Sequence, residues 1–334
     1  MITSDRRFTL AIFLFFSIAA VLITPFLGMK TISVKDVLQL TTENLNAEIY
    51  WRIRLPRILT AFLAGAALAI SGMAFQAMFR NPLATPFTLG VSSGAAFGAA
   101  LFVKLGLFFS IAGVSGQALF AFLGAMLSIG LVYGISRMKK GFSTTAMLVA
   151  GVAINFFFSS LILFIQYLSD FSRSFQIIRW LMGGFEIVGF QPVLTLLPFV
   201  LVGSATIFML THELNLLMLG EDLAISRGGD VNKIKLILFF ATSLMVGSVV
   251  AVCGPIGFVG MMAPHICRLL IGPEHKYLSR ASWLFGGAFL VVCDLLSRMI
   301  IAPAEIPVGV ITALLGGPFF IWLLIRSRYE SVIS

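Results

Sequence analysis

The chain carries very little charge. Only 11% of its 334 residues are Asp, Glu, Lys or Arg, whereas a soluble globular domain carries about 25%. Because so few charged residues cannot cover a water-exposed surface, we infer that lipid solvates most of the molecule. The 59% of hydrophobic residues and the 31 glycines agree with this inference, because small residues let membrane helices approach one another closely.

Sequence motifs for nucleotide or metal chemistry are also missing. No G-x-x-x-x-G-K-[ST] loop occurs, so the chain does not bind ATP in the P-loop manner. No H-E-x-x-H motif occurs, which argues against an intramembrane metalloenzyme. His265 has no partner ligands at a suitable spacing, and the three cysteines lie in apolar stretches where core packing is expected. We therefore expect no directly bound cofactor or metal.

About ten apolar runs are long enough to cross a bilayer as helices, which takes about 20 residues each. The first run follows Arg6 and Arg7 and is longer than a signal-peptide core, so we expect it to be retained. Gly254-Pro255 divides one long apolar stretch in two, and without this break the count is nine. The expected fold is an all-α membrane protein with a single transmembrane domain over residues 1–334. The predicted spans are 8–27, 57–79, 87–109, 117–136, 146–168, 192–210, 234–253, 255–271, 281–300 and 306–325.

The distribution of Lys and Arg predicts the orientation. With both termini in the cytoplasm, most of the 23 basic residues fall in cytoplasmic loops, as the positive-inside rule requires. The net charge of +9 is assigned to these loops, since no basic run interleaved with aromatics points to nucleic acid. Arg52, Arg54 and Arg57 cluster on the outer side against the rule, which suggests that they have another use.

The predicted spans contain few ionisable groups. Asp294 and Arg298 are the clearest, and their i, i+4 spacing allows an ion pair on one helix face. An ion-coupled secondary transporter usually buries carboxylates or histidines in mid-membrane. Their scarcity favours a transporter that is driven by an external motor over such a carrier.

A polar segment at about 211–233 is the longest cytoplasmic stretch inside the chain. Glu221 and Asp222 follow Gly220 and suit the first turn of a short helix, where acids complement the helix dipole. Gly228 and Gly229 suit its end, and Asp230 or Asn232 can cap the next span. The segment predicts two short helices with a tight bend, and an ordinary capped loop is the alternative.

Nearly the whole chain resembles the permeases of ABC importers for iron–siderophore complexes, haem and vitamin B12. The resemblance rests on several motifs in order, each weak when taken alone. They are Arg54-Leu-Pro-Arg57, Gly65-Ala-Ala-Leu-Ala-Ile-Ser-Gly72, Asn81-Pro-Leu-Ala-Thr-Pro86, Leu89-Gly-Val-Ser-Ser-Gly94, Trp180-Leu-Met-Gly-Gly184, Leu219-Gly-Glu-Asp-Leu-Ala224, Gly257-Phe-Val-Gly-Met-Met-Ala-Pro-His-Ile-Cys-Arg268 and Glu305-Ile-Pro-Val-Gly309.

The resemblance implies a type II ABC importer permease in the inner membrane. Two such chains, identical or paralogous, would form the pathway, and a homodimer is the first expectation. Two separate ATPase subunits would hydrolyse ATP, so the permease itself is not an enzyme, and a substrate-binding protein would deliver cargo from outside. An iron–siderophore complex is the first expected cargo, followed by vitamin B12 and haem.

The resemblance also assigns roles to particular residues. The ATPase would be coupled through Leu219, Gly220, Glu221, Asp222, Ala224, Arg227 and Gly228. The binding protein would dock on Arg54, Arg57 and Arg298, for which snorkelling at the lipid headgroups is the alternative. The gate would be Ser143, Thr144 and Thr145, with Asn155 in the pathway or, alternatively, in an interhelical hydrogen bond.

Overall fold

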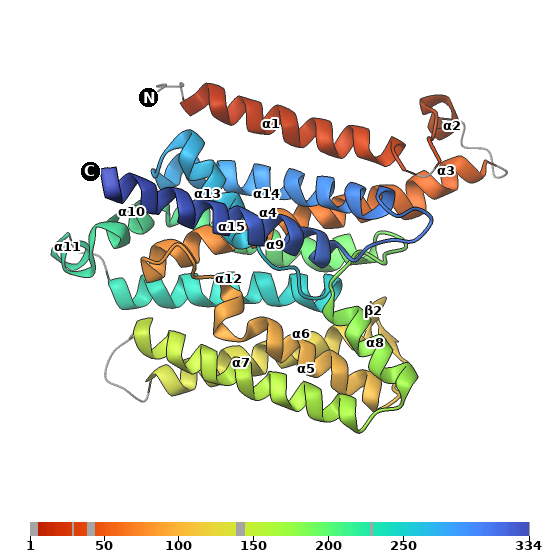
Figure 1. Ribbon diagram of the computed structural model, residues 1–334, viewed down its shortest axis with the longest axis horizontal. Coiled ribbons are helices and arrows are strands. Elements are labelled where there is room, and N and C mark those ends of the chain that lie inside the picture. The colour runs from red at the N-terminus through yellow and green to blue at the C-terminus, as the bar shows by residue number, and fades with distance from the viewer. Residues whose placement is uncertain (1–5, 29, 39–43, 138–143, 228–229, 334) are drawn as a thin grey trace.

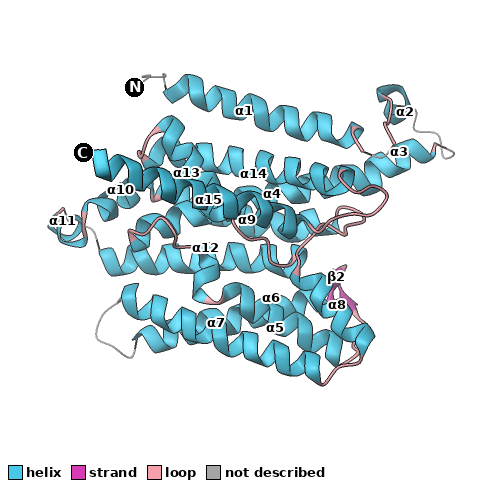
Figure 2. Ribbon diagram, viewed as in Figure 1, coloured by secondary structure: helices cyan, strands magenta, loops and turns pink. Residues whose placement is uncertain are grey.

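The computed structural model is a bundle of helices that run along one common direction (Figure 1). It describes residues 6–28, 30–38, 44–137, 144–227 and 230–333. Within these ranges every regular element is a helix except one short antiparallel hairpin (Figure 2). The hairpin joins β1 (Ser110–Ile111) to β2 (Val114–Ser115).

The helices follow the order of the predicted spans, with shorter helices between them. They are α1 (Arg6–Ile23), α2 (Val34–Leu38), α3 (Leu45–Ile49), α4 (Leu55–Phe79), α5 (Val91–Lys104), α6 (Gly116–Arg137), α7 (Thr144–Tyr167), α8 (Phe171–Leu181), α9 (Gln191–Met209), α10 (Thr211–Leu219), α11 (Glu221–Ser226), α12 (Val231–Cys253), α13 (Val259–Ile271), α14 (His275–Met299) and α15 (Val308–Ile333). Short turns of 3₁₀ helix occupy Thr24–Phe26 and Pro86–Leu89, and a turn of π helix occupies Tyr50–Arg54.

Each of the ten predicted spans corresponds to an apolar helix. In the described part of the chain, seven helical segments are long and apolar enough to cross a membrane, and α5, α13 and α15 contain the shorter apolar stretches. The predicted break is confirmed, because α12 ends at Cys253 and Gly254 follows with a left-handed φ of +69°. The approximate helix count from the sequence therefore holds.

Helix α4 forms the centre of the bundle, and almost every residue from Pro56 to Met78 is buried. Two of its glycines make this possible. A Cβ on Gly65 would lie 2.2 Å from the carbonyl oxygen of Gly286 in α14, and one on Gly72 would lie 1.8 Å from that of Gly260 in α13. Backbones touch at both crossings, as small residues allow in membrane helices.

Helix α1 lies at the edge of the bundle beside α14 (Figure 1). The Ser17 hydroxyl donates to the Leu284 carbonyl at 2.9 Å, and Arg6 forms an ion pair with Glu274. The two helices therefore begin at the same end of the molecule. That end also carries α10 and α11, whereas α2, α3 and α8 lie at the opposite end (Figure 1).

Candidate functional site

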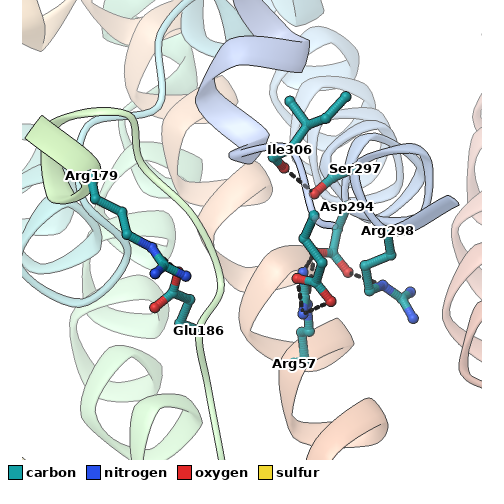
Figure 3. Close-up of polar contacts among 8 residues, drawn as sticks. Arg57, Arg179, Glu186, Asp294, Ser297, Arg298 and Ile306 are labelled. Atoms are coloured by element: carbon teal, nitrogen blue, oxygen red, sulfur yellow. Dashed lines mark hydrogen bonds and ion pairs between the residues drawn. The ribbon is translucent and has the colours of Figure 1, made fainter. Parts of the chain in front are cut away.

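Arginines and acids gather at the end of the bundle that carries α3 and α8. Arg57 at the start of α4 points to Asp294 in α14, with Nη2 2.8 Å from Oδ1. Arg298 binds the other oxygen of the same carboxylate, its Nε lying 3.1 Å from Oδ2 (Figure 3). Glu305 in the loop before α15 accepts from Arg57 at 2.9 Å. One buried carboxylate thus holds two guanidinium groups together.

Arg54 is bound by the backbone instead of by an acid. Its guanidinium donates to the carbonyls of Pro25 and Lys30, at 2.9 and 2.5 Å. Arg54, Arg57 and Arg298 are each only 8% exposed in the single chain. A carboxylate of another protein can reach them only if the surrounding loop or acids move, so docking on these residues stays a prediction.

The sequence spacing predicted the i, i+4 ion pair of Asp294 and Arg298. It did not predict that Arg57 pairs with both Asp294 and Glu305. Arg57 and Asp294 are 237 residues apart in the chain. The three arginines and two acids leave this cluster with one excess positive charge. The Nη2 atom of Arg298 is buried without a hydrogen-bond partner among the described residues, so the cluster retains an unused donor.

A cavity of 890 Å³ opens beside the cluster, and Arg57 and Glu305 belong to its wall. Its opposite wall comes from α8 and the loop after it, where Arg179 Nε donates to Glu186 Oε1 at 2.8 Å (Figure 3). Trp180 and the backbone of Gly183–Gly184 complete that side. The cavity is thus an opening at this end of the bundle that charged pairs flank on two sides.

The opposite end carries the predicted coupling segment as two short helices, α10 and α11. Gly220 separates them with a φ of +127°, and Glu221 and Asp222 occupy the first turn of α11. Asp230 caps α12, because its side chain accepts from the Lys233 amide at 3.1 Å. The predicted helix–bend–helix is confirmed. Gly228, also assigned to it, lies outside the described residues.

The two acids of α11 face different surroundings. Glu221 turns inward, with Oε1 2.7 Å from Nζ of Lys235 in α12 and 4.0 Å from Nη2 of Arg80 after α4. Asp222 is exposed, as are Leu219 and Arg227, whereas Ala224 is buried. Only part of the predicted coupling set is therefore available to another subunit.

The predicted gate residues lie at the start of α7. Thr144 begins this helix and Thr145 is exposed, whereas Ser143 lies outside the described residues. Asn155 is exposed about three turns further on, between the exposed Val152 and Phe156, and its side chain makes no hydrogen bond to another described residue. An amide on the surface of an apolar helix needs water or another chain as its partner.

One serine motif requires separate mention. Residues 90–94 match G-x-S-x-G, but a nucleophile elbow joins a strand to a helix, and here a turn of 3₁₀ helix precedes α5. The serine of the motif, Ser92, lies in the first turn of α5, and the neighbouring Ser93 hydroxyl donates to the Gly90 carbonyl at 3.0 Å. The segment serves to start a helix.

Comparison with known proteins decides the family. The model of the FecCD transport family matches residues 13–326. The chain belongs to this family. FecCD permeases are the membrane components of ABC importers, and the apolar helices agree with a multi-pass protein of the inner membrane.

Relatives of this FecCD permease carry different cargoes. The chain is 40% identical to the vitamin B12 import system permease protein BtuC of Klebsiella pneumoniae, over 83% of this chain and 82% of that protein. It is 35% identical to the Fe(3+)-citrate import system permease protein YfmD of Bacillus subtilis, over 83% and 81%. A solved metal-chelate type ABC transporter, in an inward-facing conformation, superposes with a TM-score of 0.85 at 31% identity, covering 95% of this chain and 99% of that one.

Proposed function

We propose that this FecCD permease forms half of the pathway of an importer that moves an iron–siderophore complex into the cytoplasm. Family membership supports the importer class. The likeness to an Fe(3+)-citrate permease and to a metal-chelate transporter supports an iron chelate as cargo. Both termini and the α10–α11 segment would lie on the cytoplasmic side, in agreement with the distribution of Lys and Arg.

The observation that carries this proposal is the helix–bend–helix at 211–226. It presents Leu219, Asp222 and Arg227 outward, at the same end as both termini. We assign this surface to one of two partner ATPase subunits, since the chain has no P-loop of its own. Glu221 has a second role, because its ion pair with Lys235 ties the coupling helix to the spanning helix α12.

At the opposite end, we assign the excess positive charge of the cluster to docking of a substrate-binding protein. Arg54, Arg57 and Arg298 would meet acidic residues of that protein once the loop around Lys30 moves aside. Charges at an interface mainly set the encounter rate and the register of docking. Cargo released there would enter beside the 890 Å³ cavity.

The exposed face of α7 would meet a second permease chain around the pathway. Asn155 and Thr145 would then face water or the partner and not lipid, in which an unpaired amide is costly. In this proposal the ATPase subunits move α11, and α12 moves with it. The pathway then opens alternately outward and inward, which is alternating access.

Vitamin B12 is the second candidate cargo, favoured by the 40% identity to a B12 permease; haem is the third. Uptake tests decide among them. Cells with and without this gene are offered iron-labelled siderophores, cobalt-labelled vitamin B12 and haem in parallel, and the deletion is complemented with the wild-type gene. Selective loss of iron–siderophore uptake is expected, and selective loss of B12 or haem uptake would reassign the cargo.

The same cells test the mechanism. Deletion of the partner ATPase should abolish uptake, whereas collapse of the proton gradient at constant ATP should leave it intact. The opposite pattern would contradict the importer proposal and favour an ion-coupled carrier.

A further inference from the structure

A groove of 410 Å³ opens between α1 and α14 at the end that carries the termini. No residue of the proposed transport sites belongs to it. Helix α9 contributes one side chain to its wall. The residues that line it are Arg7, Leu10, Ala11, Leu14, Phe208, Arg280, Trp283 and Leu284.

The groove is charged at one end and apolar along the rest. Arg7 and Leu14 lie two turns apart on α1, and Arg280 lies one turn before Leu284 on α14, which is the spacing that places residues on one helix face. Arg7 lies in the first turn of α1 and Arg280 in the second turn of α14. Both residues therefore lie in the half of the groove that is nearer the helix starts, while Leu14 and Leu284 lie deeper. Both arginines are exposed.

This polarity matches one kind of ligand. We propose that the groove binds an anionic phospholipid, with its phosphate between Arg7 and Arg280 and an acyl chain against the apolar wall. Basic pockets between membrane helices at this depth bind anionic headgroups, and the fork of a guanidinium suits phosphate oxygens. The volume lies within the range of about 300–1,000 Å³ of ligand sites.

Two further contacts favour a preformed groove. Trp283 is fixed in the wall, since its Nε1 donates to the Ser204 hydroxyl of α9 at 3.2 Å. The ion pair of Arg6 and Glu274 holds the first turns of α1 and α14 together beside the groove. A lipid bound there would bridge α1 to α9 and α14, where α1 otherwise has lipid on most of its surface.

The competing interpretation is that both arginines merely snorkel to the bulk headgroups. Snorkelling gives no retained lipid after purification and no dependence on two particular residues. The two interpretations therefore differ in a measurable way.

The test is native mass spectrometry of the permease, purified with its partner subunits, after addition of phosphatidylglycerol and phosphatidylcholine with identical acyl chains. The wild type should retain phosphatidylglycerol over phosphatidylcholine by tenfold or more, because both headgroups carry a phosphate but the choline cation of phosphatidylcholine is repelled by the two arginines. The double variant Arg7→Gln/Arg280→Gln should lose this preference. Lys233→Gln, which removes an exposed charge at the same end of the molecule, should keep it.

A second variant tests the apolar half without changing charge. Ala11→Phe places a ring in the groove from an exposed position and should reduce retention of phosphatidylglycerol while the complex stays assembled. Equal retention of both lipids by the wild type would overturn the proposal. So would a preference that survives in Arg7→Gln/Arg280→Gln, or one that is lost equally in Lys233→Gln.

Discussion

Lys235 lies inside the protein, yet its Nζ is 2.7 Å from Oε1 of Glu221 on the short helix α11. Lys235 is 1% exposed. Its partner Glu221 is one of the residues that the family resemblance assigns to coupling with the ATPase. A buried ammonium that loses its partner is strongly destabilising. If α11 moves, then α12 must move with it, or the ion pair of Glu221 and Lys235 must break.

The first prediction concerns this ion pair. Glu221→Lys and Lys235→Glu should each uncouple ATP hydrolysis from transport, because each places two like charges in contact. The double variant Glu221→Lys/Lys235→Glu should regain coupling, since the pair is restored with its sign reversed. The measurement is transport per ATP hydrolysed in proteoliposomes, and a loss of 1.4 kcal/mol of coupling free energy corresponds to about tenfold.

Asp222 supplies the matched control for that experiment. Asp222→Lys should also reduce coupling, because the exposed Asp222 side chain would face the proposed ATPase partner, but Lys235→Glu should not rescue it. If the Glu221 double variant stayed as uncoupled as the single variants, Glu221 would belong to the ATPase interface after all.

The second prediction concerns the carboxylate that Arg57 and Arg298 share. Asp294→Asn removes the acid that the buried Arg57 and Arg298 share and leaves Arg57 only the half-exposed Glu305, and breaking a buried ion pair costs about 3–5 kcal/mol. Glu305→Gln should cost less than about 1 kcal/mol, because Glu305 is 46% exposed. Thermal unfolding of both variants in the same detergent gives the comparison. Equal melting temperatures would show that Asp294 is not the centre of this cluster.

The third prediction separates docking arginines from bystanders. Arg54→Gln should weaken binding of the substrate-binding protein, whereas Arg52→Gln should not, although Arg52 has the more exposed side chain and forms an ion pair with Glu48. Surface plasmon resonance at two salt concentrations provides the affinities, with melting temperatures as the check for folding. Weaker binding in Arg52→Gln alone would move the docking site to the exposed charges.

The fourth prediction concerns the surroundings of Asn155. The three native cysteines are buried and free, so single cysteines can be introduced over a low background. Asn155→Cys should react with a charged, water-soluble thiol reagent, since thiolate formation requires water. Leu123→Cys, on the exposed apolar face of α6, should not. No reaction at either position would instead favour a hydrogen bond between Asn155 and the partner chain.

The fifth prediction concerns helix packing. Gly72→Ala forces a methyl group against the Gly260 carbonyl, and overpacking of this kind costs about 1–3 kcal/mol. Gly130→Ala is the control, because nothing lies within 4 Å of its added Cβ, and alanine favours a helix by about 0.5–1 kcal/mol. Melting temperatures should fall for the first variant and hold or rise for the second.

Hydrophobic run length located all ten apolar helices, because a helix that crosses lipid needs about 20 apolar residues, although only seven of them are long and apolar enough to cross in the described part of the chain. The short helix α8 was missed, since its apolar side chains alternate with polar ones and Arg179 within eleven residues. The predicted span 87–109 extends beyond α5 (Val91–Lys104) at both ends. There Gly90, with a φ of +77°, separates a 3₁₀ turn from α5.

The functional site was predictable where its parts are close in sequence. The bend at Gly220, the cap at Asp230 and the i, i+4 pair of Asp294 with Arg298 all follow from local spacing. The ion pairs of Arg57 with Asp294 and of Lys235 with Glu221 do not, because they depend on which helices lie side by side. Lys235 is the clearest case, because it is buried in α12, whereas lysine is almost never fully buried unless it is paired.

The position of α1 beside α14 constrains how the protein is made. The partners Arg6 and Glu274 are separated by 268 residues, so the first helix is synthesised long before its main neighbour α14. Helix α14 has a mean hydropathy of 1.3, below the 2.0–2.4 of the other six long spans, because it carries Asp294 and Arg298. Because Arg57 of α4 pairs with Asp294, we expect α14 to become stable in the membrane only when it packs against the already inserted α4, so that the bundle would close late in translation.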